Sequence, residues 1–365
     1  MKKGYYIHFE AKRTPGVAKK IDMQISEFSK IYEMHEIEIH SEDVNIMKRF
    51  MRFLPGGAIE RTYEKGLSQI SNPDFVYIRR TTADKAYISF LKEIKRKWPK
   101  CKMIVEIFTY PYDRDEFKRL LTWPYYFKEI YNRKKLTGIV DRYVTYSEDE
   151  KIFGIPTIRT GNGIIVEHVK MPKTEEHEEL RLIAVAHMQK HHGYERLIKG
   201  MRDYCKKPNV RKVHCILVGD GPEKNKYVNM VQRYDLQKYI TFFGTTVGAE
   251  LDLLYEKAEI AVSALGLYKD KVDREASLKS RECLAKGFPM VTGCKVDVIK
   301  EEYPYVCEFP NDKSPIDIEK VVSFYENLLK KQTRAEIQHS IRNFAKETVD
   351  MSVMLRPIVK YIECE

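Results

Sequence analysis

The residues with the clearest chemical potential lie in one stretch, Arg274 to Gly293, with the sequence REASLKSRECLAKGFPMVTG. Its middle, Ser277 to Lys286, consists largely of good helix formers, and a glycine and a proline then end the predicted helix. At the helix start, Ser277 and Lys279 offer a hydroxyl group and a cation beside free backbone N–H groups, which suits the binding of a phosphate. Glu282, one to two turns further on, is placed to accept hydrogen bonds from sugar hydroxyls. An alternative interpretation of this segment alone is a capped amphipathic helix with a solvated charged face.

Alternating strand and helix patterns precede this stretch and must position it. Short apolar runs end in polar or glycine-bearing loops, and the loops lead into helical patterns. In parallel sheets of this kind, ligands bind beyond the carboxyl ends of the strands. The four upstream segments are Leu180–Met201, Val213–Val231, Tyr239–Thr246 and Ala249–Leu265.

In this order and spacing, the segments resemble the nucleotide-sugar half of GT-B glycosyltransferases of the group 1, or family-four, type. The resemblance covers Leu180 to Cys294 and extends more weakly into the flanks. It implies an α/β fold with two Rossmann-like domains that face each other across a cleft, and a C-terminal helix that crosses back to the first domain. The implied parts are an acceptor-binding domain (residues 1–165), a nucleotide-sugar-binding domain (residues 166–345) and the returning helix (residues 346–365).

The resemblance also assigns candidate roles to residues of this chain. It implies that residues of both halves hold the donor nucleotide sugar: Gly16, His187, His192, Gly219, Phe243, Gly244, Ser277, Leu278, Lys279 and Glu282. The candidate catalytic residues are Lys279, Glu275, Asp113 and His187. No metal ligand is predicted, because the sequence shows no cluster of histidine and acidic residues with ligand spacing.

Two departures from the family pattern affect these assignments. His187 and His192 stand where the family commonly has arginine and lysine, and histidine is largely neutral near neutral pH. Neutralisation of the donor diphosphate therefore falls mainly on Lys279. The family also often carries a pair of glutamates here, but Arg274 occupies the position of the first, and Glu275 is one place out of register. Either the loop slips by one residue, or Arg274 selects an acidic or otherwise unusual donor sugar.

The N-terminal half shows the same alternation of strands and helices, which predicts a parallel sheet. At the end of one of its strands, Glu106, Tyr110, Tyr112 and Asp113 form a candidate rim for the acceptor. Asp113 also begins an Asp-Arg-Asp sequence, the metal motif of the other glycosyltransferase fold, although a solvated turn is the favoured interpretation. The predicted strands are Gly4–Phe9, Glu36–His40, Asp74–Arg80, Lys102–Thr109 and Arg142–Ser147.

Two segments, Asn45–Leu54 and Phe117–Leu136, combine aromatic and other apolar residues with basic ones. Such segments suit the interface of an anionic bilayer. The first also fits an ordinary core-facing helix, and the second also fits single-stranded nucleic acid, whose bases stack on aromatic rings. No recognised nucleic-acid-binding signature accompanies them. An anionic membrane surface or a lipid-linked acceptor is therefore the favoured partner, and nucleic acid is not expected.

Composition sets the outer bounds on these predictions. A chain of 365 residues that is 43% hydrophobic can bury ample core, and its length favours two domains. The net charge of +11 implies an anionic partner without identifying it. The seven cysteines are dispersed, which is typical of reduced thiols in a cytosolic protein. Because no apolar run is long enough to span a membrane and no signal segment is evident, we expect a cytoplasmic protein, peripherally associated with the inner membrane face.

Together these features predict a glycosyltransferase of the hexosyl type. The expected donor is a nucleoside diphosphate sugar, with UDP as the default nucleotide, and the expected acceptor is a lipid-linked saccharide in the synthesis of a bacterial capsule, exopolysaccharide or O-antigen. The resemblance implies retention of configuration, and no metal or other cofactor is expected if protein donors stabilise the leaving phosphate. The absence of a nucleophile elbow and of a P-loop leaves hydrolase and kinase activities with little support. Two alternatives remain: a GT-B epimerase or soluble-acceptor transferase, and a GT-B binding protein that has lost catalysis.

Overall fold

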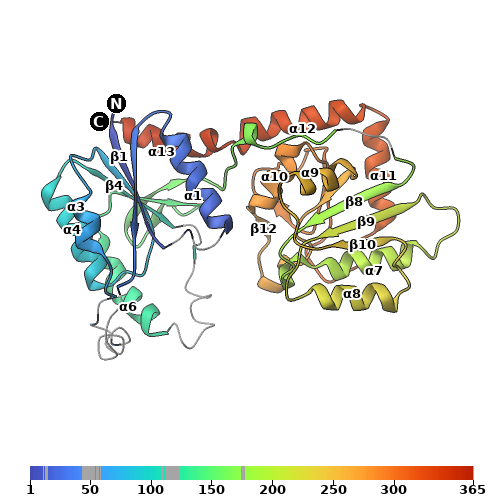
Figure 1. Cartoon of the computed structure of the whole chain (residues 1–365), viewed down its shortest axis with the longest axis horizontal. Coiled ribbons are helices and arrows are strands. Elements are labelled where there is room, and N and C mark those ends of the chain that lie inside the picture. Colours follow the sequence, from blue (N-terminus) through green and yellow to red (C-terminus); the bar gives the residue numbers. More distant parts are fainter. Residues whose placement is uncertain are drawn as a thin grey trace. The chain divides into compact units, whose positions relative to one another are not determined.

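The structure is a computed structural model that describes residues 1–364 except 11, 13–14, 43–53, 55–56, 58, 108–109, 112–122 and 174–176. By its internal contacts, the chain divides into two compact units (Figure 1). The first unit consists of Met1–Gly161 together with Met354–Glu365, and the second is Asn162–Val353.

The first unit is built on a sheet with the strand order β2-β1-β3-β4-β5-β7-β6. Neighbouring strands are parallel except for the antiparallel pair β6–β7. Helix α1 covers one face of the sheet and helices α3 and α4 cover the other (Figure 1). The central strands β1, β3 and β4 are therefore largely apolar runs, because both faces of the sheet are buried there. The strands are β1 (Lys3–Phe9), β2 (Glu33–Ile39), β3 (Phe75–Arg79), β4 (Lys102–Ile107), β5 (Arg142–Thr145), β6 (Lys151–Ile152) and β7 (Ile155–Arg159), and the helices are α1 (Pro15–Phe28), α3 (Tyr63–Ser68), α4 (Lys85–Lys97) and α6 (Trp123–Arg133).

The last helix, α13 (Met351–Glu363), ends against the first unit. Lys2 Nζ donates to Ile362 O at 2.9 Å, and Lys102 Nζ donates to Tyr361 O at 3.0 Å. These two cations satisfy carbonyl groups at the end of the helix, where the helix dipole is negative. The expected return of the C-terminal helix to the first domain is thereby confirmed.

The second unit is built on a sheet of parallel strands in the order β10-β9-β8-β11-β13-β15. Successive strands move outward from β8 in one direction as far as β10, and β11 then returns to the other side of β8. The topological switch point therefore lies between β8 and β11, and a ligand site is expected beyond their carboxyl ends. The strands are β8 (Leu180–Val185), β9 (Val213–Val218), β10 (Ile240–Phe243), β11 (Ile260–Val262), β13 (Met290–Thr292) and β15 (Val306–Glu308), and a separate short ladder joins β12 (Arg274–Glu275) to β14 (Lys295–Val296). The helices are α7 (Tyr194–Tyr204), α8 (Lys224–Arg233), α9 (Gly248–Glu256), α10 (Leu278–Lys286), α11 (Ile318–Leu329) and α12 (Arg334–Thr348).

The prediction of two Rossmann-like sheets is confirmed, and most predicted strands and helices are present within a few residues. The sequence analysis did not predict the β6–β7 hairpin, the β12–β14 ladder or β15. The segment Asn45–Leu54, apart from Leu54, lies outside the described residues, as does the first part of Phe117–Leu136. None of the helices in the described ranges has the length and apolar character that a bilayer crossing requires.

Candidate active site

A pocket of about 240 Å³ lies at the switch point of the second unit. Its walls come from the loop after β8, the loop after β11 and the start of α10. The carboxyl ends of these parallel strands meet at one edge of the sheet, so side chains that are distant in sequence converge there. Among the lining residues are His191, His192, Leu267, Val272, Arg274, Glu275, Ser277 and Lys279.

The two loops are in close backbone contact. Leu265 N donates to His192 O at 2.9 Å, and Gly266 N donates to His191 O at 3.1 Å. Gly193 has a φ of 63°, and a Cβ atom there would lie 2.5 Å from Gly266 N. Only glycine meets both demands, and it allows the two loops to form the pocket wall together.

His192 enters the pocket as a neutral group. Burial, with a further effect of the nearby Lys279, lowers the pKa of His192 to about 2. Gln189 N donates to His192 Nδ1 at 2.9 Å, so the ring proton resides on Nε2. Burial also lowers the pKa of His191. In agreement with the sequence argument for His192, both of these histidines supply hydrogen-bonding groups and not positive charge near neutral pH.

Lys279 supplies positive charge to the pocket. Its Nζ donates to Tyr194 Oη at 3.1 Å and lies 5.6 Å from the centre of the Tyr194 ring. Burial lowers the pKa of Lys279 to about 8, although the neighbouring Glu275 acts in the opposite direction. At neutral pH the ammonium form therefore dominates, and it stands beside the first turn of α10, whose initial N–H groups have no acceptor within the helix. Glu282 lies one turn further along α10, on the same face as Lys279.

Glu275 is buried at the edge of the pocket. Ser263 Oγ donates to one carboxylate oxygen at 2.6 Å, and Ser277 Oγ donates to the other at 3.2 Å. Burial raises the pKa of Glu275. Ser277 is also the N-cap of α10, because its Oγ accepts from Ser280 N at 3.2 Å. These contacts order the loop, and the catalytic role of Glu275 stays a prediction.

A ring of hydrogen bonds fixes the loop that carries Glu275 and Ser277. Asn162 Nδ2 donates to Ala276 O at 2.6 Å, and Arg281 Nε donates to Asn162 O at 2.9 Å. The Arg281 guanidinium, which is fully buried, also pairs with Asp297 Oδ2 at 2.7 Å. Asp297 N in turn donates to Glu275 O at 3.0 Å and closes the ring. Asn162 and Arg281 are therefore positioning residues.

Four other predicted donor residues lie beyond β8, β9 and β10, outside the pocket lining. His187 is exposed after β8, and the N–H of Gly219 already donates to Phe243 O and Gly244 O, both at 3.1 Å. Gly219 has a φ of 120°, and a Cβ there would lie 2.0 Å from Ala186 O, so this glycine is required for loop packing. Gly244 borders open space, and the edge position of Phe243 leaves its ring partly exposed. Their roles toward a nucleotide remain predictions.

The predicted residues of the first unit have mixed outcomes. Gly16 is exposed in the first turn of α1, and Asp113 lies outside the described residues. The expectation that Glu106 lines an acceptor rim is wrong, because its side chain is fully buried. It pairs with Lys20 at 2.7 Å and with Arg79 at 3.4 Å. Burial raises the pKa of Glu106, but these two cations outweigh burial and the pKa is lowered.

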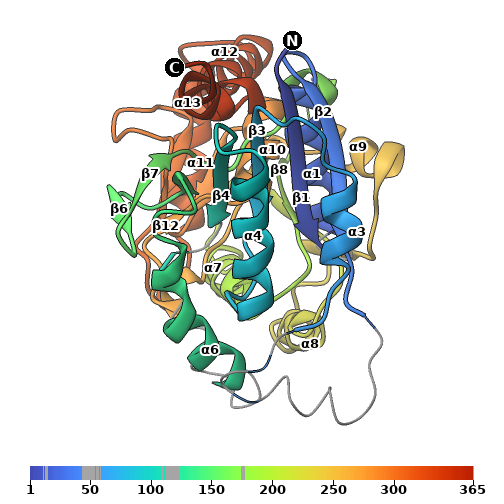
Figure 2. The ribbon, with the colours of Figure 1, turned by 90° about the vertical axis from the view of Figure 1, so that its left-hand side faces the viewer.

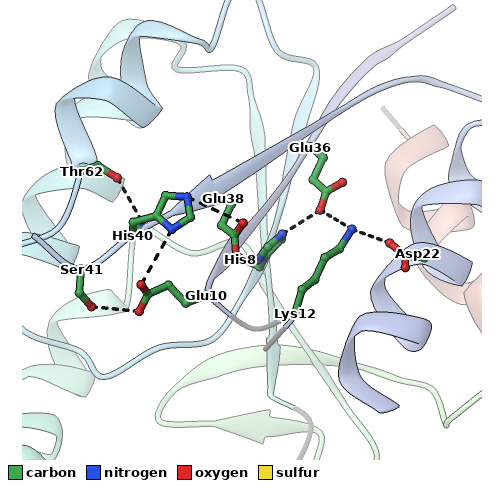
Figure 3. Close-up of polar contacts among 9 residues, drawn as sticks. All are labelled: His8, Glu10, Lys12, Asp22, Glu36, Glu38, His40, Ser41 and Thr62. Carbon is green, nitrogen blue, oxygen red and sulfur yellow. Dashed lines mark hydrogen bonds and ion pairs between the residues drawn. The ribbon is translucent and has the colours of Figure 1, made fainter. Parts of the chain in front are cut away.

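A polar cluster that the sequence analysis did not identify occupies the carboxyl ends of β1 and β2 (Figure 3). His8 Nε2 lies 2.8 Å from Glu36 Oε1, and Lys12 Nζ lies 2.7 Å from the same oxygen. His40 Nε2 lies 3.8 Å from Glu38 Oε2. Parallel pairing puts His8 directly beside Glu38, and alternation along β2 puts Glu36 and Glu38 on one face. We call this cluster, together with Glu10 and Asp22, the acidic rim. The only sequence signal for it was the alternation of the segment EIEIH.

Comparison with solved structures identifies the fold as GT-B. A glycosyltransferase from Rickettsia africae ESF-5 aligns with a TM-score of 0.64 and 14% identity over 100% of this chain and 98% of that chain. The Anabaena protein HepE in complex with UDP aligns with a TM-score of 0.62 and 11% identity over 99% of each chain. The apo form of the lipopolysaccharide outer core galactosyltransferase WaaB aligns with a TM-score of 0.58 and 12% identity over 99% of each chain.

The family assignment comes from the sequence of the second unit. Residues 167–276 match the family described as glycosyl transferases group 1, and this range contains most of the pocket wall. No curated protein matches the chain significantly in sequence. The resemblance to group 1 glycosyltransferases is confirmed for residues 167–276, and the chain is a glycosyltransferase that uses a nucleotide sugar.

The pKa of Lys279 predicts a pH dependence of nucleotide binding. Protonated Lys279 attracts a diphosphate, so affinity should be full below pH about 8 and should fall, by at most about tenfold per pH unit, above it. We expect calorimetric titration with UDP between pH about 7.5 and about 9.5 to show this decline. Lys279→Arg should remove the decline because arginine stays charged, and Lys279→Ala should bind weakly at every pH. A wild-type affinity that is constant over this range would contradict the assignment.

The hydrogen-bond ring predicts a binding defect in Asn162→Ala. Loss of the bond to Ala276 O, about 1 kcal/mol, should loosen the pocket loop and raise the Kd for the nucleotide about threefold to tenfold. Asn162→Asp also lacks the donor and should show the same defect, whereas Asn225→Ala, at an exposed site on α8, should match the wild type. Calorimetry and thermal unfolding measured together provide the test. A lower Tm with an unchanged Kd would show that Asn162 acts only on stability.

Proposed function

We propose that this enzyme transfers a hexosyl group from a UDP-sugar to a lipid-linked saccharide during the synthesis of a bacterial surface polysaccharide, with retention of configuration. The observation that carries the proposal is the pocket at the switch point of the second unit, where Lys279 and the start of α10 offer positive potential to a diphosphate. UDP is proposed because it is bound in the related Anabaena structure.

In this proposal, the second unit stabilises the leaving group. When the bond between the anomeric carbon and the β-phosphate oxygen breaks, the electron pair stays on the phosphate and negative charge develops there. Lys279 and the first-turn N–H groups of α10 are preorganised to stabilise that charge without a metal. The neutral Nε2–H of His192 adds a hydrogen-bond donor. The acceptor hydroxyl forms the new bond to the anomeric carbon and passes its proton to the departing β-phosphate oxygen.

We propose that the first unit binds the saccharide acceptor, with the acidic rim around His8 as its recognition surface (Figure 3). Glu10, Glu36 and Glu38 are partly exposed carboxylates, which accept hydrogen bonds from sugar hydroxyls. Lys12 is the single lysine among the residues drawn in Figure 3, where four residues carry carboxylates, so the rim offers more hydrogen-bond acceptors than donors. A neutral or amino-bearing saccharide fits this charge better than an acidic one.

We further propose that α6 brings the enzyme to the cytoplasmic face of an anionic membrane. Phe127 and Tyr131 are 50% and 69% exposed on this helix, which Figure 2 shows at the lower end of the first unit. Lys134 and Lys135 follow directly, and Lys135 Nζ lies 3.9 Å from the centre of the Tyr131 ring. Exposed rings beside lysines suit the headgroup region of a bilayer.

The donor proposal predicts selective stabilisation by one nucleotide. UDP or its sugar conjugates should raise the unfolding temperature of the protein, whereas GDP, ADP and CMP should not. At a ligand concentration of about 100 times Kd, the free energy of unfolding should rise by roughly 2.7 kcal/mol. Lys279→Ala and Glu282→Ala should lose the shift, and Lys257→Ala, at an exposed lysine just after α9, should keep it. No shift with any nucleotide would contradict the donor site. Release of an isomerised free sugar, or binding without turnover on any acceptor, would instead support the epimerase or binding-protein alternatives.

The membrane proposal predicts weaker vesicle binding when the rings of α6 are removed. The double variant Phe127→Ser with Tyr131→Ser should bind vesicles of phosphatidylcholine and phosphatidylglycerol about tenfold less tightly, because apolar area and a ring–cation contact are lost. Co-sedimentation measures this partitioning. The matched control is Leu253→Ser with Tyr239→Ser, two exposed apolar side chains of the second unit. Equal loss in both double variants, or no loss in the first, would argue against α6 as the contact.

A further inference from the structure

A second cavity of the second unit is unrelated to the pocket at the switch point. It has a volume of about 670 Å³ and is formed by segments that precede the strands of the second unit. His177, Arg211 and Glu259 stand just before β8, β9 and β11, and the end of α11 and the start of α12 complete the wall. We call it the amino-edge pocket. The six-residue strands β8 and β9 separate it from the switch-point pocket by about 20 Å, so the two sites are distinct.

Basic side chains from three segments line the amino-edge pocket: Arg211, Lys330, Lys331 and Arg334. Two carboxylates also line it, and both have partners inside the protein. Glu259 is paired with His177 at 2.6 Å and Arg334 at 3.1 Å, and it also accepts from Arg181 N at 2.7 Å. Glu336 accepts from both the N–H and the hydroxyl of Thr333 in a capping box.

The remaining cations are available to a ligand. Lys330 Nζ donates to the neutral Asn327 side chain at 3.2 Å, and across the described residues neither Lys330 nor Lys331 has an ion-pair partner. Arg211 pairs at 3.3 Å with Glu326, whose side chain is 45% exposed, and such a pair is weak and easily exchanged. The pocket also borders the N-terminus of the fifteen-residue helix α12, whose dipole adds positive potential.

The pocket has an apolar wall as well as a basic one. Tyr325 and Leu329 of α11 contribute side chains beside the cations. A volume of about 670 Å³ is in the range of small-molecule sites and exceeds the need of a lone inorganic ion. We propose that the amino-edge pocket binds a phosphorylated small molecule of about nucleotide size, with its phosphate at Arg211, Lys330 and Lys331. The phosphate can belong to a free nucleotide or to a phospholipid headgroup. This site does not depend on the proposed function.

Hydrogen exchange on the full-length protein locates the binding. The probes are inorganic pyrophosphate, UDP and vesicles of phosphatidylcholine with phosphatidylglycerol. Protection of residues 326–336 by pyrophosphate or UDP would support a soluble ligand, and protection by vesicles alone would support a headgroup. Use of the Lys279→Ala variant separates this site from the switch-point pocket, because protection of residues 326–336 should persist when binding at Lys279 is impaired. Protection of this segment by none of the probes would overturn the proposal.

Charge variants test the chemistry of the site. In the Lys279→Ala background, Arg211→Ala with Lys331→Ala should weaken pyrophosphate binding about tenfold, because two charge-assisted contacts are lost. Lys206→Ala with Lys238→Ala removes the same charge from exposed sites elsewhere in the second unit and should change the affinity less than about twofold. Equal effects of the two double variants would show that pyrophosphate is bound by general electrostatic attraction, and would refute the proposed site. A failure of the donor-site proposal would be distinguished separately: in that case the wild-type and Lys279→Ala proteins would bind UDP with the same affinity.

Discussion

The buried guanidinium group of Arg281 holds the loop that carries Glu275 and Ser277 in the candidate active site. A charge removed from water costs several kcal/mol, and only a complete set of acceptors offsets that cost. Arg281 finds its acceptors on Asn162 and Asp297, and both of these residues bind the backbone of the pocket loop. The loop is therefore positioned by contacts among distant segments and not by its own turn sequence. Any displacement of the loop would leave part of the charge without a partner.

The strand order places this loop where it is useful. Because β8 and β11 are neighbours but their connections run in opposite directions, the loops that follow them separate and leave room at the carboxyl edge. Gly193 and Gly266 then allow the two backbones to touch on one side of that space. The result is a pocket whose lining includes two histidines with lowered pKa values, His191 and His192, and one lysine, Lys279. The opposite edge of the same sheet forms a larger basic pocket without this loop arrangement.

Local sequence was sufficient for most of the fold and for part of the site. The strands Lys3–Phe9 and Phe75–Arg79 agree with the predicted ranges Gly4–Phe9 and Asp74–Arg80 to within one residue at each end, because each is a short apolar run. The helix from Leu278 and its lysine were also predicted from composition and capping. The short strands β12 and β14 were not predicted, since two-residue ladders have no periodic pattern. Partly exposed strands such as β6 lacked the apolar run that identified the others.

The positioning residues were not predictable for a different reason. In the sequence, Arg281 is a charged residue on an amphipathic helix, and such residues are usually solvated. Its burial depends on Asn162 and Asp297, which are distant along the chain, so no local pattern reveals it. Glu106 was misassigned for the same reason, since the two cations that pair with it, Lys20 and Arg79, come from other elements. In both cases the ion pair is a tertiary feature.

The electrostatic contrast between these buried charges and Lys279 points to function. Arg281 and Glu106 each have opposite charges at hydrogen-bonding distance, and the pKa of Glu106 is lowered accordingly. Lys279 is also largely removed from water, but its hydrogen bond is to a neutral hydroxyl, and the pKa of the lysine is lowered because its charge is incompletely compensated. A diphosphate would supply the missing negative charge and raise that pKa. In the proposed function, the free enzyme therefore holds a cation whose environment the donor substrate would complete, and this property suits leaving-group stabilisation.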